Sequence, residues 1–188
     1  MKQLVPILYK LLVCLPIFGF SQSINLKEWV DSIPLQEQPV RFDLSNLNPN
    51  ERVLTETQVE FLQIEQFITM NDSIKSSLHV PFRLDLSKDY HTFISVYKDL
   101  NGVRHSYLSN YSLNFELVDW IKVAYTQRSK RADYMNFRVN QGWLSTDRKQ
   151  QNRTFHQTYI ISPKGKIKPY RSRDLASFLN DSCITDIR

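Results

Sequence analysis

One hairpin pattern occurs twice in this sequence. The stretch YLSNYSLNFELVDW, Tyr107 to Trp120, returns in altered form about fifty residues later as YIISPKGKIKPY, Tyr159 to Tyr170. Each copy has an aromatic start, an aliphatic neighbour, a polar turn and a second strand of mixed apolar and polar residues. The recurrence predicts two successive antiparallel units, near residues 81–126 and 133–170, each with about four short strands joined by hairpins.

Period-two alternation supports this prediction. After Pro81, the apolar residues Phe82, Leu84 and Leu86 alternate with polar ones, as in a half-buried strand. Later strands are expected at residues 92–98, 103–111, 115–125, 135–139, 143–149 and 153–161, with a final strand ending at Tyr170. Turns are expected at residues 99–102, 112–114, 141–142 and 163–165.

The predicted fold class is therefore mainly β, within α+β: an antiparallel meander of about 7–9 strands. Two four-stranded units resemble propeller blades, but two blades cannot close a ring of the usual ~4–8. The units are expected to curl into a partly open barrel or a sandwich, with N-terminal segments covering an open edge. A coincidental likeness between the two hairpins stays open as the alternative to a duplication.

One or two short helices are expected in the N-terminal part. The segment INLKEWVDSI is typical of a short helix or an extended arm that ends at Pro34, and a brief strand is expected at Val40–Leu44. The best helix candidate is TETQVEFLQIEQFITM, because Thr55 and Gln58 have the spacing of a capping box. Alternation from Val53 to Phe61 leaves a strand open there.

The first 21 residues have the pattern of a secretory signal peptide. Two lysines precede and flank an apolar run, and cleavage is expected near Ser21–Gln22. A membrane anchor is the alternative, although prolines and a lysine interrupt the run. Acylation of Cys14 would require a small residue before it, and Val13 is branched. The expected organisation is a signal peptide (1–21), a helical and irregular segment (22–80), an antiparallel β domain (81–173) and a short C-terminal helix or tail (174–188).

The number of cysteines limits the disulfide bonds that the chain could form once the signal peptide is removed. Only Cys183 would remain, so no intrachain disulfide is expected. A free thiol and a disulfide-linked dimer both stay open.

The chain resembles small uncharacterised secreted β-rich proteins of Bacteroidota-type bacteria. The residues that carry the likeness are the leader end FGFSQ, the segment LTETQVEFL, the strand pair LDLSKDYHTFISVY, and YLSNYSLNFELVDWIKVAY followed by YIISPKGKI. The resemblance implies an envelope location and a β-rich fold, and it carries over no functional residue. The short end DSCITDIR is unlike a sorting domain, which favours a secreted or periplasmic product.

Charge is unevenly distributed along the chain. Residues 22–97 hold 6 Lys+Arg against 11 Asp+Glu, whereas residues 98–173 hold 15 against 5. The basic half predicts a surface for an anionic polymer or an envelope protein, with Arg128, Lys130 and Arg131 as the densest run. Solvated strand faces that keep sheet edges soluble are the alternative explanation. There is no strong nucleic-acid motif and no transmembrane segment beyond the leader.

Catalytic and metal signals are sparse. The four histidines have no HExxH or i, i+4 pair, and there is no cysteine cluster, so no metal or cofactor is expected. His105, His156 and Asp119 are the only candidates for acid–base chemistry, and they would have to converge in a cleft. Asp119 is expected on an apolar strand face with Leu117 and Ile121. There it would otherwise serve as a buried hydrogen-bond acceptor for a turn, or lie at a bulge.

Two functions of different class remain. The first is a non-enzymatic binding or assembly module of the envelope, and the second is a small secreted hydrolase acting on polysaccharide or peptide. Trp120 and Trp143 are candidate binding residues because exposed aromatic rings on a sheet stack on sugars or on partner proteins. For Trp120, burial under the N-terminal helices is the competing expectation.

Overall fold

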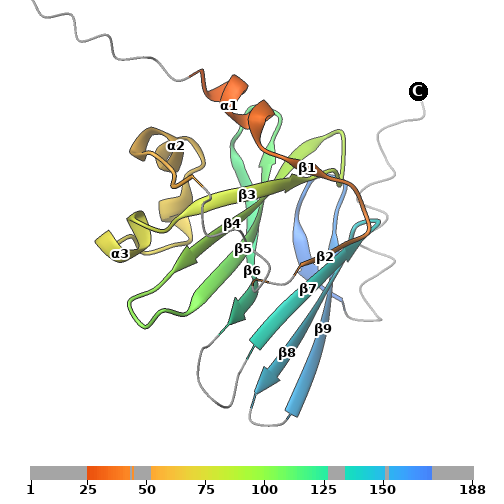
Figure 1. The fold of residues 1–188 in the computed structure, drawn as a ribbon. Helices are drawn as coiled ribbons and strands as arrows, with labels where there is room; N and C mark the ends of the chain where they lie inside the picture. Colours follow the sequence, from red (N-terminus) through yellow and green to blue (C-terminus); the bar gives the residue numbers. More distant parts are fainter. Residues whose placement is uncertain (1–24, 43, 45–51, 127–133, 151–152, 171–188) are drawn as a thin grey trace, which may run out of the picture.

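The structure is a computed structural model that describes residues 25–42, 44, 52–126, 134–150 and 153–170. Within these ranges the chain forms three short α-helices, a 3₁₀ helix and ten strands (Figure 1). In chain order they are α1 (Leu26–Ser32), β1 (Leu35–Gln36), β2 (Val40–Phe42), α2 (Glu56–Phe61), η2 (Ile64–Gln66), α3 (Asp72–Lys75), β3 (His79–Leu84), β4 (Tyr90–Lys98), β5 (Arg104–Ser112), β6 (Leu117–Thr126), β7 (Tyr134–Asn140), β8 (Trp143–Gln150), β9 (Arg153–Ile161) and β10 (Ile167–Pro169).

The strands form one open sheet in the order β1-β3-β4-β5-β6-β7-β8-β9-β10. Only β1 runs parallel to its neighbour, and the other pairs are antiparallel. The prediction of an antiparallel meander is confirmed, although the sheet has ten strands and does not close into a barrel. The two residues of β1 follow Pro34 and are too few to show an alternating pattern, so the sequence did not indicate them.

Eight of the ten strands form two successive four-stranded meanders, at the places where the repeated hairpin predicted them, and β1 and β2 add to these. We call β3–β6 the first unit and β7–β10 the second unit. Only Tyr125 and Thr126 of β6 pair with Met135 and Tyr134 of β7. Beyond that point β2 pairs with β7, so the expected strand near Val40 joins the second unit. Figure 1 shows α2 and α3 on one side of the first unit and β7–β9 on the other.

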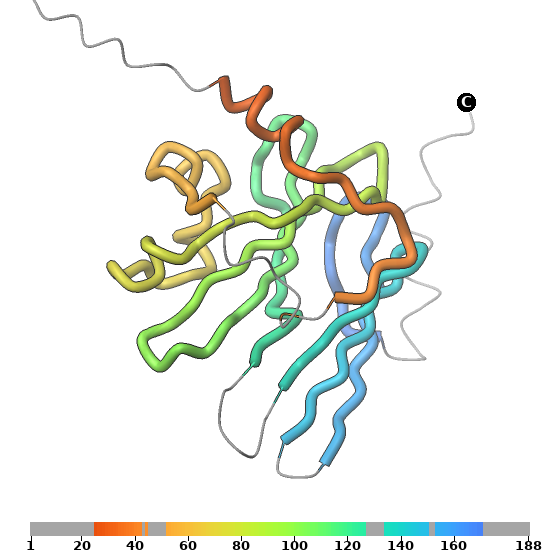
Figure 2. Tube along the Cα trace, viewed as in Figure 1, coloured from red at the N-terminus to blue at the C-terminus, as the bar shows by residue number. Residues whose placement is uncertain are grey.

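The first unit is covered on both faces, and β4 is consequently buried along nearly its whole length. Alternate residues such as Ile94 and Val96 belong to a cluster that also contains Phe137, Val139 and other residues of the second unit. The intervening residues, such as Phe93, pack in a second cluster with the helical segment. Figure 2 shows the N-terminal segment, in red to orange, running from α1 past the first unit to β2, which pairs with β7.

The two recurring hairpins share one turn geometry. In the β5–β6 turn, the Ser112 Oγ accepts a 3.2 Å bond from the Glu116 N–H, and in the β9–β10 turn the Ser162 Oγ accepts a 3.0 Å bond from the Lys166 N–H. The fourth residue of each turn has positive φ, +62° at Phe115 and +80° at Gly165. The β4–β5 turn repeats this arrangement without belonging to the repeated stretch. The demands of one turn type therefore account for much of the likeness.

Three expectations about local structure were wrong. The helix expected from Thr55 is capped as predicted by Thr55 and Gln58, but it ends at Phe61, because Gln63 adopts a left-handed conformation (φ +49°). Phe115 lies in a turn rather than on a strand. The register shift between Asn110 and Tyr111 in the β5–β6 ladder separates Leu117 from Ile121, and the two residues belong to different apolar clusters. The single apolar face expected for β6 therefore does not exist.

Buried hydrogen bonds attach the last hairpin of the second unit to the first unit. The Asn110 side chain accepts a 2.7 Å bond from Thr92 Oγ1 and donates a 2.7 Å bond to the Gly165 carbonyl oxygen, and Asn110 is fully buried. Nearby, Asp119 Oδ2 accepts a 2.9 Å bond from the Ile167 N–H. Both polar ends of the Asn110 amide are satisfied, and its bond to Gly165 holds the β9–β10 turn against β5. The Asp119 bond holds β10 against β6.

We expect Gly165→Ala to destabilise the protein more than Gly102→Ala. Both glycines have positive φ, +80° and +76°. A Cβ at Gly165 would lie 3.3 Å from carbons of Asn110 and Tyr90, whereas at Gly102 it would meet only the flexible end of Lys98 at 3.5 Å. Conformational strain is common to both variants and costs about 1 kcal/mol, and crowding adds about 1–3 kcal/mol at Gly165 alone. Urea unfolding measures both, and equal losses would contradict a tightly docked hairpin.

Candidate functional site

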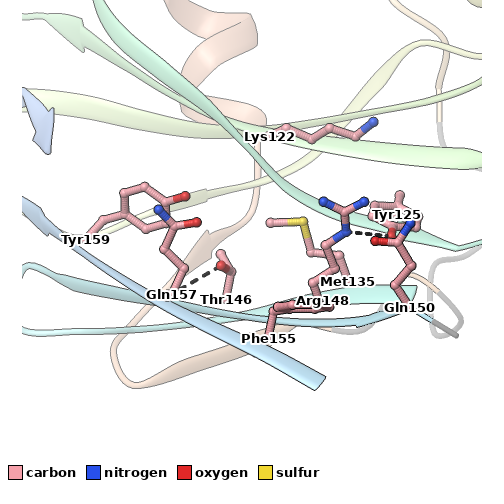
Figure 3. A pocket seen from close by; sticks show the side chains of 9 residues that line it. All are labelled: Lys122, Tyr125, Met135, Thr146, Arg148, Gln150, Phe155, Gln157 and Tyr159. Carbon is pink, nitrogen blue, oxygen red and sulfur yellow. Dashed lines mark hydrogen bonds between the residues drawn. The ribbon is translucent and has the colours of Figure 1, made fainter. Parts of the chain in front are cut away.

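A cavity of about 570 Å³ opens between β6 and the second unit. Its lining residues come from four strands: Lys122, Tyr125, Met135, Thr146, Arg148, Gln150, Phe155, Gln157 and Tyr159. In Figure 3 the Arg148 and Gln157 side chains point from β8 and β9 toward β6, which carries Lys122. The volume lies within the ~300–1,000 Å³ typical of small-molecule sites.

The strand register in the second unit determines which side chains of β7, β8 and β9 line the cavity. The tight turn at Gln141–Gly142, with φ of +47° and +79°, fixes Asn140 opposite Trp143. From there, Met135 lies opposite Arg148, which lies opposite Phe155, so the three form one row across β7, β8 and β9.

The next row on the same face of these strands, which contains Phe137 and Thr146, marks the boundary between core and cavity. Phe137 and Thr146 lie opposite each other and are buried at 1% and 2% exposure, whereas Phe155 in the cavity row is 50% exposed. The same strand faces thus change from apolar core to open cavity along their length.

A β-bulge in β6 determines which side chains line the opposite side of the cavity. Residues three apart on a regular strand point to opposite faces, so Lys122 and Tyr125 would normally diverge. The register shift puts Lys122 opposite Tyr107 and Tyr125 opposite His105, two positions apart on β5. Both side chains therefore line the same cavity.

Two cations converge on one tyrosine in this cavity. The Arg148 Nε donates a 3.2 Å bond to the Tyr125 hydroxyl, and the Lys122 Nζ lies 5.4 Å from the centre of the Tyr125 ring. Burial lowers the pKa of Lys122; Asp99 opposes this effect and the Arg148 cation adds to it. Neither cation forms a salt bridge with a carboxylate in the described part of the chain. The arrangement favours binding of an anion.

The three candidate catalytic residues do not come together. His105 Nε2 lies 2.9 Å from Asp99 Oδ2, and His156 Nδ1 lies 2.5 Å from Asp147 Oδ1 on β8. Asp119 is bonded to the backbone N–H groups of Ile167 and Trp120. His105 and Asp119 are also five ladder positions apart along β5, a separation of roughly 17 Å. Asp119 accepts hydrogen bonds next to the register shift between Asn110 and Tyr111, but it is half-buried rather than buried, and its donors are backbone N–H groups.

The candidate binding residues have different surroundings. Trp120 is 40% exposed, yet its ring stacks on Phe67 at 5.4 Å, so it combines the two expectations given above. Trp143 is also 40% exposed and packs edge-on against Tyr170 at 5.3 Å. Arg128, Lys130 and Arg131 lie outside the described residues.

A second cavity, of about 460 Å³, lies in the helical segment and has the opposite charge. Glu56, Glu60 and Glu65 line it together with one cation, Lys75. Among residues with described positions, no group of three or more His, Cys, Asp or Glu could hold a metal ion. Nor does the described chain contain a helix long and apolar enough to cross a membrane.

Sequence reasoning did not identify the residues of the cavity between β6 and the second unit. A usable signal was present in β8, where alternation from the buried Leu144 places Thr146, Arg148 and Gln150 on the same face. Three polar residues continuing an apolar face indicate that the core ends there. No comparable sequence pattern indicated that Lys122 and Tyr125 of β6 line the same cavity, because their shared orientation depends on the bulge.

Comparisons with models of known protein families, with curated proteins and with solved structures found no match to this chain.

Protonation of His105 is expected to make stability pH-dependent. Burial lowers the pKa of His105 from 6.5; its hydrogen bond to Asp99 opposes the shift and the Lys122 cation adds to it. As the pH falls below about 6.5, the unfolded chain takes up a proton that the folded chain resists, so the free energy of unfolding decreases. His105→Gln keeps an N–H donor for Asp99 but does not titrate.

Urea unfolding at about pH 7.5 and about pH 5.5 checks this prediction. The variant should lose less free energy of unfolding between the two conditions than the unmodified chain does. Some loss should remain, because burial also lowers the pKa of His91. An equal loss in both proteins would show that His105 is not the group responsible.

Proposed function

We propose that this chain is an exported, non-enzymatic binding protein that holds an anionic ligand in the cavity between β6 and the second unit. The observation that carries the proposal is the convergence of Lys122 and Arg148 on Tyr125 in a cavity whose lining includes no carboxylate. Two like charges held near each other are stabilised when an anion enters between them.

The lining also favours binding over catalysis. It contains no carboxylate, imidazole or thiol, the groups that most often transfer protons or attack substrates. The hydrolase hypothesis required His105, Asp119 and His156 to share a cleft, and each has separate partners. No observation of this molecule favours that second function.

The residues that line the cavity lie in the basic part of the sequence. All nine lining residues fall within residues 98–173, the segment with a net charge of +10. A basic surrounding raises the local concentration of anions and speeds their association, and added salt weakens this effect. The proposed export rests on the leader pattern of residues 1–21.

We expect Arg148→Gln to weaken binding of an amphipathic anion, with 1-anilinonaphthalene-8-sulfonate as the probe. Its sulfonate matches the two cations and its rings match Phe155 and Tyr159. Loss of one charge-assisted contact should raise the dissociation constant about tenfold. Probe fluorescence in a titration gives the constant.

Lys149→Gln is the matched control. Lys149 is the next residue on β8 and, by alternation, points to the opposite face, where its Nζ lies 6.0 Å from the Tyr134 ring centre. The control removes the same charge and should leave binding unchanged at a given ionic strength. Equal weakening by both variants would mean that overall charge, not the cavity, binds the probe.

Export predicts a shortened N-terminus. When the full chain is expressed in a bacterium, the protein recovered outside the cytoplasm should begin near Gln22, after removal of the apolar leader. Intact-mass measurement locates the cut. Accumulation in the cytoplasm with residues 1–21 retained would contradict export.

A further inference from the structure

Polar groups other than the two cations define what else the ligand carries. Gln150 and Gln157 line the cavity, and neither side-chain amide has a hydrogen bond to another described residue. Thr146 already donates to the Gln157 backbone carbonyl at 3.4 Å. Each glutamine amide offers donors and an acceptor, a combination that complements hydroxyl groups.

Aromatic rings form much of the apolar lining of the cavity. Phe155 is half exposed, and Tyr159 is half-buried at the edge of the apolar core. Flat rings next to amide groups suit a ligand whose surface alternates between apolar C–H faces and hydroxyls. A purely hydrocarbon body would cover both glutamine amides without bonding to them, at a penalty of about 1–3 kcal/mol each.

We propose that the anionic ligand is an acidic sugar, a pyranose with a carboxylate group. Lys122 and Arg148 pair with the carboxylate, Gln150 and Gln157 bond to ring hydroxyls, and Phe155 packs on the C–H face of the ring. Two cations beside amide groups and aromatic rings match the groups of a single acidic sugar. A nucleic-acid backbone would require a longer row of cations. This inference rests on the proposed function and names the ligand class for the same cavity.

Three probes separate the chemical features of the ligand: glucuronate, glucose and octanoate. Glucose keeps the hydroxyls without the charge, and octanoate keeps the carboxylate without the hydroxyls. In titrations of the labelled protein followed by ¹⁵N–¹H correlation spectra, glucuronate should shift amide signals of β6, β8 and β9. It should bind about tenfold more tightly than either glucose or octanoate.

Gln157→Leu gives the discriminating variant. It removes an amide and adds apolar surface, so glucuronate binding should weaken about tenfold while octanoate binding is retained or strengthened. Arg148→Gln should weaken both anions, and Lys149→Gln should weaken neither. An octanoate affinity above that of glucuronate, or no response of glucuronate to Gln157→Leu, would overturn the acidic-sugar assignment.

The two proposals fail in distinguishable ways. If octanoate or the sulfonate probe binds in an Arg148-dependent manner and glucuronate does not, the cavity binds anions and the sugar assignment is wrong. If glucose equals glucuronate, the charge requirement is wrong for both proposals. If none of the anions shifts the signals of β6, β8 and β9, the proposed function falls together with the inference.

Discussion

The buried amide of Asn110 is the contact on which the arrangement of the two units depends. It joins Thr92 on β4 to the carbonyl oxygen of Gly165 in the β9–β10 turn, over two bonds of 2.7 Å. An apolar residue of similar size would leave the Thr92 hydroxyl and the Gly165 carbonyl without their partner. Glycine is favoured opposite it, because φ is +80° there and a Cβ at Gly165 would lie 3.3 Å from the Asn110 and Tyr90 side chains. Asn110 and Gly165 thus restrict which residue can occupy the other position, although they are 55 residues apart in the sequence.

The cavity depends on this docking. The β6–β7 ladder pairs at only two positions, so the shared apolar core and contacts at the other end of the second unit hold it against the first. The contacts of Asn110 with Gly165, and of Asp119 with Ile167, hold the far end of the second unit against β5 and β6. With both ends held, β8 and β9 present their polar face to β6, where Arg148 meets Tyr125. The residue that first appeared to be a candidate acid, Asp119, thus has a structural role in positioning the cavity.

Local patterns predicted much of the fold and little of the site. Alternation and turn residues predicted the strands of both units, because these signals act between near neighbours in the chain. The capping box at Thr55 was predicted for the same reason, but the early end of the helix at Phe61 depends on the packing of the following turn. At β6, alternation failed because bulges at two register shifts change which face a residue occupies. The pairing of Lys122 with Tyr125 in one cavity follows from such a bulge.

The sequence by itself determined the class of the molecule: an antiparallel meander of two four-stranded units, a helical N-terminal segment and a basic second half. Each of these follows from residue type, spacing or net charge, which are properties of short stretches or of composition. The tertiary structure alone decided that Arg148 and Lys122 share a cavity and that His105, Asp119 and His156 do not. Contacts between distant strands depend on register, bulges and buried hydrogen bonds, and these are settled only when the two units pack against each other.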